Sequence, residues 1–338
     1  MGSTSLKKEK VASFSSEKKG VFSLLFLFFT LFSFAQVTTN SSSGLAATYP
    51  SLASAITALN GATITAPVVI TLTGNETAPL GGYSITAQGD VTNTIIIQGV
   101  SSTITAPTPQ TSGLLNDAIF KLIGADYVTI QGFIMLENPL NTTTAAASNN
   151  MTEWGVALLY ATTSNGAQNN TIRNNTIDLN RTYQNTFGIY CNATHTASAP
   201  TTSATAIAGG GNNGLKVYEN NITDVNIGIL VVGPTAAADH NDGIDIGGVS
   251  LTTGNTITNY GTTGTFSSYA NVSGSVNGIL VRNSKNFNIS YNTITSSNGG
   301  ITSGTLRGVF IPAFNNAPTG NILNNINKKF IFKSAKDD

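Results

Sequence analysis

The sequence predicts an all-β protein built as a solenoid, in which short strands recur in a fixed order and stack on one another. An apolar residue with a β-branched residue five positions before it recurs along the chain, and a second pattern, Gly followed by Ile or Val, recurs between its copies. The first pattern repeats every 33 to 45 residues without a helical pattern between copies. Hairpin arrays need turns every 8–12 residues or so, and longer periods of this kind are typical of solenoids.

Composition supports a folded β protein. Charged residues make up only 9% of the 338 residues, whereas Gly, Asn, Thr and Ser are abundant. Disordered chains combine low hydrophobicity with high net charge, and this chain has neither. We therefore expect an ordered all-β core with many turns.

The first 35 residues predict a signal peptide. Five lysines precede the apolar run 21–34. This run is too short to span a bilayer core, because a spanning helix needs about 20 residues. Ser33 and Ala35 supply the small residues of a cleavage site, so cleavage is expected after Ala35. A buried helix or a membrane anchor is the alternative. We expect a secreted or cell-surface protein with no membrane span after cleavage.

Loss of this leader removes five Lys and two Glu, which leaves 11 basic and 14 acidic residues. No basic stripe remains to bind nucleic acid.

Residues 36–50 are expected to be extended. The range 51–60 predicts a helix, because Leu52, Ala55, Ile56 and Leu59 recur at helical spacing and Gly61 can end it in a left-handed conformation. This helix would cap the open edge of a β-helix at 51–326.

The repeat can be written out along the chain. The β-branched and apolar positions pair as Ile95/Val100, Val128/Phe133, Ile172/Ile177, Val217/Ile222, Leu251/Ile257 (one place off) and Ile289/Ile294. The second series is Gly155-Val156, Gly188-Ile189, Gly228-Ile229, Gly278-Ile279 and Gly308-Val309. Inward Ile and Val should form ladders through the stack, and Asn at the bends should bond to its equivalent in the next coil.

The segments VTIQGF, VYENNITDV, ISYNTIT and the GILV strands resemble right-handed parallel β-helix repeats of the pectin-lyase-like superfamily. The resemblance covers roughly residues 60–326 and implies the fold. It says little about function, because this scaffold carries lyases, hydrolases, tailspikes and adhesin-like surface proteins. Residues 327–338 lack a cap pattern, so we expect an irregular tail or a truncated chain.

The acidic turn 239–245 is the best candidate for chemistry. Asp239, Asn241 and Asp245 offer alternate oxygen ligands around a Gly turn, as calcium requires, although no trailing Glu follows. The turn also resembles the NTDGID segment of polygalacturonases, which implies catalytic roles for Asp242 and Asp245. Further acidic and His motifs of that family are missing. A solvated turn is the third interpretation.

Other candidates are single residues. Arg282 and Arg307 flank Gly-Ile/Val strands. They could bind an acidic sugar, or they could simply keep the surface soluble. The similarity to pectate lyases implies that Arg282 could act as a base. Trp154, the only Trp, could stack on a sugar or pack at the core edge. Cys191, the only Cys, should be a small buried hydrophobe.

These residues leave three functions open. The first is a non-catalytic secreted or surface β-helix that acts as a structural or adhesive module. The second is a polysaccharide lyase or glycoside hydrolase acting on acidic polysaccharide, and the third is a carbohydrate-binding module. The expected partner is a polysaccharide or cell-surface glycan, and the expected cofactor is none, or calcium at the acidic turn.

Overall fold

The structure, a computed structural model, describes residues 36–145, 148–192, 210–263, 275–296, 305–312 and 319–328. The chain divides into the units Met1–Ala35 and Gln36–Asp338, and the first unit, with the predicted signal peptide, lies outside the described residues. The predicted tail is described only at Asn327 and Lys328, which belong to a strand. Among the described helices, none has the length and apolar character needed to cross a membrane.

Strands account for nearly all of the regular structure, and two large sheets hold most of them. Sheet A contains β1 (Val37–Thr39), β2 (Thr48–Tyr49), β3 (Val68–Leu72), β4 (Glu76–Thr77), β6 (Ile95–Thr105), β8 (Val128–Leu136), β10 (Thr171–Arg173), β11 (Thr176–Asp178), β13 (Lys216–Tyr218), β14 (Asn221–Thr223), β17 (Asp245–Ile246), β18 (Thr256–Tyr260), β21 (Phe287–Ser290), β22 (Thr293–Ser296), β24 (Gly320–Leu323) and β25 (Ile326–Lys328). Sheet B contains β5 (Tyr83–Ile85), β7 (Ala118–Ile123), β9 (Trp154–Leu159), β12 (Phe187–Cys191), β15 (Ile227–Val232), β19 (Ser275–Arg282) and β23 (Thr305–Phe310). A small third sheet pairs β16 (Asn241–Asp242) with β20 (Ser284–Lys285).

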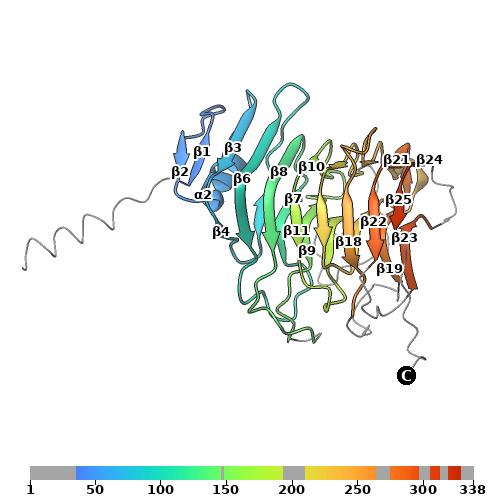
Figure 1. The fold of residues 1–338 in the computed structure, drawn as a ribbon. Coiled ribbons are helices and arrows are strands. Elements are labelled where there is room, and N and C mark those ends of the chain that lie inside the picture. The colour runs from blue at the N-terminus through green and yellow to red at the C-terminus, as the bar shows by residue number, and fades with distance from the viewer. Residues whose placement is uncertain are drawn as a thin grey trace, which may run out of the picture. The chain divides into compact units, whose positions relative to one another are not determined.

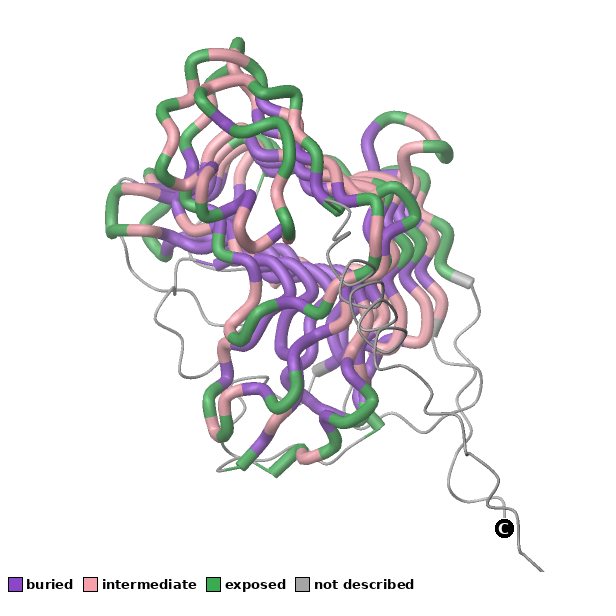
Figure 2. The backbone as a smooth tube through the Cα atoms, turned by 90° about the vertical axis from the view of Figure 1, so that its left-hand side faces the viewer, coloured by how far each residue is buried: buried purple, intermediate pink, exposed green. Residues whose placement is uncertain are grey.

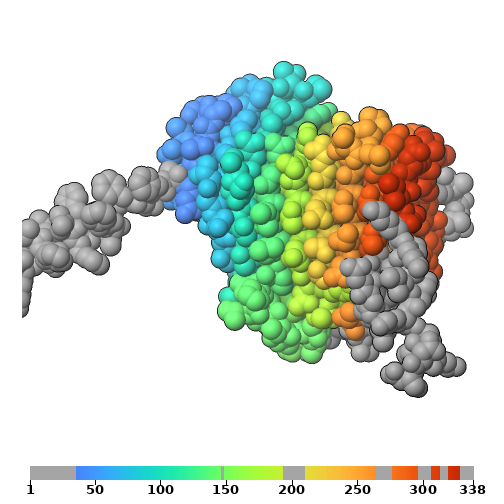
Figure 3. Space-filling view, in the orientation of Figure 1, coloured from blue at the N-terminus to red at the C-terminus, as the bar shows by residue number. Residues whose placement is uncertain are grey.

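The chain winds as a parallel β-helix, which confirms the predicted fold class. Each coil supplies one strand to sheet B and two to sheet A, and each strand pairs in parallel with its counterpart in the next coil (Figure 1). In sheet A, β10, β13, β17, β21 and β24 form a first limb, and β11, β14, β18, β22 and β25 form a second limb. The long strands β6 and β8 cover both limbs. In the space-filling view the coils lie beside one another as successive bands (Figure 3).

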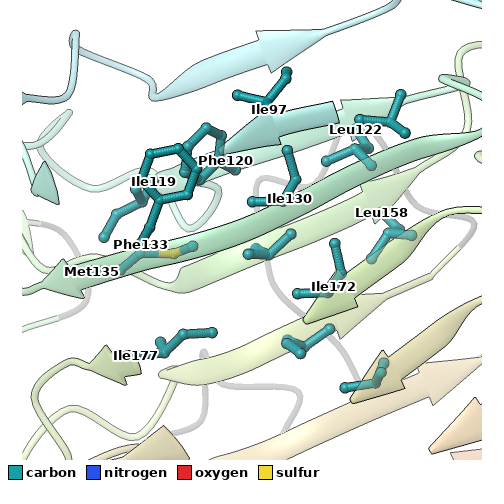
Figure 4. Packing of buried hydrophobic residues seen from close by; sticks show 14 of the residues in the cluster. Ile97, Ile119, Phe120, Leu122, Ile130, Phe133, Met135, Leu158, Ile172 and Ile177 are labelled. Carbon is teal, nitrogen blue, oxygen red and sulfur yellow. The ribbon is translucent and has the colours of Figure 1, made fainter. Parts of the chain in front are cut away.

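Inward side chains form continuous apolar ladders between the two sheets (Figure 4). Their in-register members are Ile172, Val217, Ile246 and Ile289 in the first limb, Ile177, Ile222, Ile257 and Ile294 in the second, and Val156, Ile189, Ile229 and Ile279 in sheet B. All are fully buried, and Figure 2 shows the buried path running through the stack. The ladders confirm the predicted pattern from β10 onward.

Two predicted ladder positions are wrong. Val100 is 58% exposed, because β6 is irregular between Gln98 and Ser102 and places Ile104 inside instead. Leu251 is 64% exposed in a turn, and the inward residue of that coil is Ile246. Both errors arise where the spacing of inward residues within a coil changes, at the irregularity inside β6 and at the turn between β17 and β18.

The glycine series marks the closest approach of sheet B to the second limb. A Cβ atom on Gly228 would lie 2.7 Å from Cγ2 of Ile257 and 2.5 Å from the carbonyl oxygen of Gly278. Gly155, Gly188 and Gly278 meet the opposing ladder in the same way. Gly is therefore required at this position because each opposing Ile fills the space that a side chain would need.

A ladder of asparagines, buried except for the half-buried Asn325 at its end, joins the coils at the bend between the limbs. Its members are Asn175, Asn220, Asn255, Asn292 and Asn325. From Asn220 onward, each Oδ1 accepts hydrogen bonds from the backbone N–H and the side-chain amide of the Asn in the preceding coil; for Asn255 these are 3.1 and 3.0 Å. At the start of the ladder, Oδ1 of Asn175 accepts from the backbone N–H of Phe133. The residue before several of these Asn side chains has a positive φ, as at Asn174 (51°). The predicted Asn ladder is confirmed, but a preceding residue makes the left-handed turn.

The amino-terminal end carries the predicted helix, α2 (Leu52–Gly61). Ser51 caps it by accepting a hydrogen bond from the Ser54 N–H, and Leu52, Ile56 and Leu59 are buried among the core residues. Gly61 is the last helical residue and does not have the left-handed conformation that the sequence suggested.

Replacing Gly228 with Ala should destabilise the fold by about 1–3 kcal/mol, because the new methyl group cannot enter without moving Ile257 or the backbone of Gly278. Thermal or urea unfolding of the two proteins measures the difference. Gly61→Ala is the control, since its Cβ would meet no atom within 4 Å. Equal stability of the Gly228 variant and the parent would show that sheet B and the second limb are not in close contact at this position.

Candidate functional site

The predicted acidic turn is divided between three elements. Asp239 ends the short helix η2 (Ala237–Asp239), Asp242 lies in β16 and Asp245 begins β17. Gly243 has a φ of 69°, so the chain turns sharply between the last two strands. Asp242 accepts a hydrogen bond from Asn286 (2.8 Å) and lies 3.9 Å from the Nζ atom of Lys285.

Two of the predicted calcium ligands have hydrogen-bond partners within the protein. Asn241 is fully buried, and its Oδ1 accepts a hydrogen bond from the backbone N–H of Asn212 at 2.9 Å. The oxygens of Asp245 instead accept from Tyr218 and Asn288, while Asp239 is in the separate helix η2. Within the described ranges, no group of three His, Cys, Asp or Glu side chains could hold a metal ion. The geometry gives the calcium hypothesis no support.

Asp245 belongs to a polar surface on the first limb of sheet A. The sequence predicted Asp245 as a candidate residue but did not predict this surface. Strands of the first limb alternate inward apolar and outward polar residues, so the outward side chains form rows along the stack. One row contains Lys216, Asp245 and Asn288, and the other contains Gln131, Arg173 and Tyr218. We call these six residues the polar face. Lys216 is exposed and the other five are half-buried.

Hydrogen bonds hold the polar face in place. The Tyr218 hydroxyl donates to Oδ2 of Asp245 at 2.5 Å, and Asn288 donates to Oδ1 at 2.8 Å. Arg173 forms a salt bridge of 3.0 Å with Glu219, which lies beside the face. Burial and the hydrogen bond to Asp245 raise the pKa of Tyr218, so its phenol stays protonated at neutral pH. The face thus presents fixed donors and acceptors around an aromatic ring.

Trp154 is not a surface platform. It is 1% exposed and stacks on Tyr190 with a centroid separation of 4.6 Å and an interplanar angle of 15°. Both rings belong to an apolar layer on the outward side of sheet B, which also contains Phe187, Leu230 and Leu280. We call this group the apolar layer. The interpretation of Trp154 as a packing residue fits the structure, whereas direct stacking on a surface sugar does not.

Arg282 and Arg307 also lie on sheet B. Arg282 follows the inward Val281 and pairs in register with Val232 of the apolar layer, which agrees with the predicted outward direction. Burial lowers the pKa of Arg282. The guanidinium carbon of Arg307 lies 4.3 Å from the ring centroid of Phe310. Asp242 and Asp245 lie in β16 and β17, and Arg282 lies in β19 of sheet B, where it pairs in register with Val232.

A buried acidic network was missed by the sequence reading. It consists of Asp117, Glu137, Glu153, Tyr183 and Lys121. Glu153 accepts hydrogen bonds from the Tyr183 hydroxyl and the Asp117 backbone N–H, both at 2.8 Å. Glu137 accepts from the backbone N–H and the hydroxyl of Thr152, each at 2.9 Å. These carboxylates tie together the segments that lead from sheet A to sheet B.

Burial governs the charge of this network. It raises the pKa of Asp117 to about 6 and the pKa of Glu153 well above its ordinary value, and the neighbouring carboxylates add to the increase for Glu153. Burial also lowers the pKa of Lys121, whose Nζ lies 6.0 Å from the Trp154 ring. Asp117 and Glu153 are 1% and 0% exposed, and their carboxylate oxygens accept hydrogen bonds from Thr111, Tyr183 and the Asp117 backbone within the protein. We assign the network a structural role.

Cys191 matches its prediction. It is fully buried in β12, and burial raises the pKa of its thiol to about 12. A thiol of this kind is a poor nucleophile.

Comparison with known proteins identifies only distant similarities. No family model matches the chain, and no curated protein matches it. Among solved structures, an alginate lyase from Paenibacillus sp. str. FPU-7 shares 17% identity over 82% of this chain and 97% of its own, with a TM-score of 0.24. The A-module of the Azotobacter vinelandii mannuronan C-5 epimerase AlgE6 shares 11% identity over 83% of this chain and 95% of its own, with a TM-score of 0.15. At these TM-scores neither similarity assigns a residue or an activity to this chain.

The acidic network should make stability fall as pH rises. Because the folded-state pKa of Asp117 lies above its unfolded value, the folded chain holds the proton more tightly, and this stabilisation is lost between about pH 4 and pH 6. The loss is on the order of 1–3 kcal/mol. Melting curves across this range should show a shallower decline for Asp117→Asn.

Asp90→Asn is the matched control, because hydrogen bonds within its turn lower the pKa of Asp90, the opposite direction. It should leave the decline in place. Identical pH profiles for the parent and Asp117→Asn would contradict a buried, proton-binding Asp117.

Proposed function

We propose that this chain is a secreted parallel β-helix that binds a polysaccharide along the polar face of sheet A. One observation supports this most directly. Donors and acceptors of several kinds surround an aromatic ring on a partly exposed surface, in register from coil to coil. Sugar rings offer both hydroxyl groups and an apolar face, which this combination of side chains can match.

The spacing of the face suits an extended polymer. Successive coils are about 4.8 Å apart, so each coil presents a new set of polar groups after a step comparable to one sugar residue. Lys216 and Tyr218 come from one coil, Arg173 from the coil before it and Asp245 from the coil after it. A chain lying along the stack would contact all three coils. Such binding agrees with an adhesive or carbohydrate-binding module.

Removing the Tyr218 ring should weaken glycan binding about tenfold or more, the usual effect of losing an aromatic anchor worth 1–2 kcal/mol. Retention on a panel of neutral and acidic polysaccharides should be measured for the parent, Tyr218→Ala and Tyr218→Phe. Tyr218→Phe keeps the ring but loses the hydrogen bond to Asp245, so it should retain most of the affinity if stacking dominates.

Thr256→Ala is the control, since Thr256 is exposed on the second limb and lies outside the polar face. Equal losses for Thr256→Ala and Tyr218→Ala, with unchanged melting temperatures, would contradict binding at the polar face. So would the absence of retention on every member of the panel.

The bond between Tyr218 and Asp245 favours a second candidate, a polysaccharide lyase or glycoside hydrolase. A half-buried carboxylate that shares a short hydrogen bond with a phenol can exchange a proton with a bound sugar. This function predicts that polysaccharide cleavage occurs and is lost in Asp245→Asn while retention on the same polymer persists. Measurement of new chain ends, with Asp242→Asn as the control, tests it. Cleavage that survives in Asp245→Asn would remove this candidate.

A further inference from the structure

Asn277 is an unusual residue on the outward side of sheet B. It lies in β19, is fully buried, and neither its Oδ1 nor its Nδ2 atom has a hydrogen-bond partner among the residues that the structure describes. Leaving a buried polar group unpaired costs about 1–3 kcal/mol, and most native proteins avoid this. A buried amide with both ends unpaired therefore points to a group that is bound there.

The register of sheet B shows which side chains surround this amide. Asn277 pairs with Arg307 in the next coil, and Leu280 pairs with Phe310. Neighbouring strands are about 4.8 Å apart, so the amide and the guanidinium stem lie side by side. The Arg307 guanidinium lies over the Phe310 ring at 4.3 Å. Neither of the two salt bridges found within the described ranges involves Arg307.

These groups define a specific chemistry. A guanidinium offers a planar pair of donors that fits a carboxylate, whereas an amide can donate to one oxygen and accept from a hydroxyl. The Phe310 ring and Leu280, which is 2% exposed, supply an apolar side. A metal cation would be repelled by Arg307, and a neutral sugar would leave the guanidinium without an anion.

We propose that Asn277 and Arg307, flanked by Leu280 and Phe310, bind a carboxylate that carries a neighbouring hydroxyl group, as in a uronic acid. The carboxylate lies on the Arg307 guanidinium and the hydroxyl on the Asn277 amide. This site is on sheet B and does not depend on the polar face of sheet A. If the proposed polysaccharide is acidic, a terminal uronic acid is the part that this site would receive.

Titration with D-glucuronate, followed by calorimetry and by melting temperature, tests the proposal. Glucose and acetate are the matched probes, because each carries only one of the two groups. Glucuronate should bind and raise the melting temperature, and each probe should bind at least tenfold more weakly. Arg307→Lys keeps the charge but loses the planar fork and should weaken glucuronate binding, and Asn277→Leu should abolish it.

Asn277→Leu also tests the structural alternative. If the buried amide is only a strained packing residue, this variant will melt at a higher temperature and glucuronate will have the same effect on both proteins, which overturns the proposal. No response of the parent to glucuronate also overturns it. If Asn277→Leu does not fold, the response of Arg307→Lys decides. Tyr218→Ala should leave glucuronate binding intact, so failure of the polar face and failure of this site can be told apart.

Discussion

The hydrogen bonding of each coil to the next is the constraint on which the rest of the structure depends. Parallel strand pairing fixes each residue opposite its counterpart, and the ladder from Asn175 to Asn325 fixes the bend between the two limbs of sheet A. A single unpaired Asn in this buried row would cost free energy, so the coils stack in one register. The apolar ladders and the glycine column follow from that register, because they bring equivalent residues face to face in every coil.

This constraint divides the surface by function. Inward positions are occupied by Ile and Val, and the bends by Asn, so little freedom remains there. Outward positions are free to vary, and they differ between the sheets. The polar face of sheet A carries charged and amide groups in a hydrogen-bonded arrangement, whereas the outward side of sheet B carries the buried apolar layer. Recognition can therefore be placed on two separate surfaces without disturbing the core.

Much of the fold could be predicted from the sequence, because inward residues repeat in every coil. The series that includes Gly228 and the pair Ile172/Ile177 marked their strands correctly. Val100 was misplaced because the irregularity in β6 changes the local spacing, which no periodic rule detects. The proposed binding surface was harder to predict, since the polar face joins outward residues of separate coils that share no motif. Asp117 and Glu153 were missed for the same reason, although each directly precedes a strand of sheet B, at Ala118 and Trp154.

The asparagine ladder also restricts how such a chain can change in length during evolution. Each member from Asn175 to Asn292 donates to the Asn of the coil after it, so these coils have the same polarity. Duplication of one whole coil would insert an Asn that bonds correctly on both sides. Gain or loss of part of a coil would break the row unless the extra residues left the stack as a loop. Growth of this protein should therefore occur in steps of one coil, while shorter insertions accumulate at the turns.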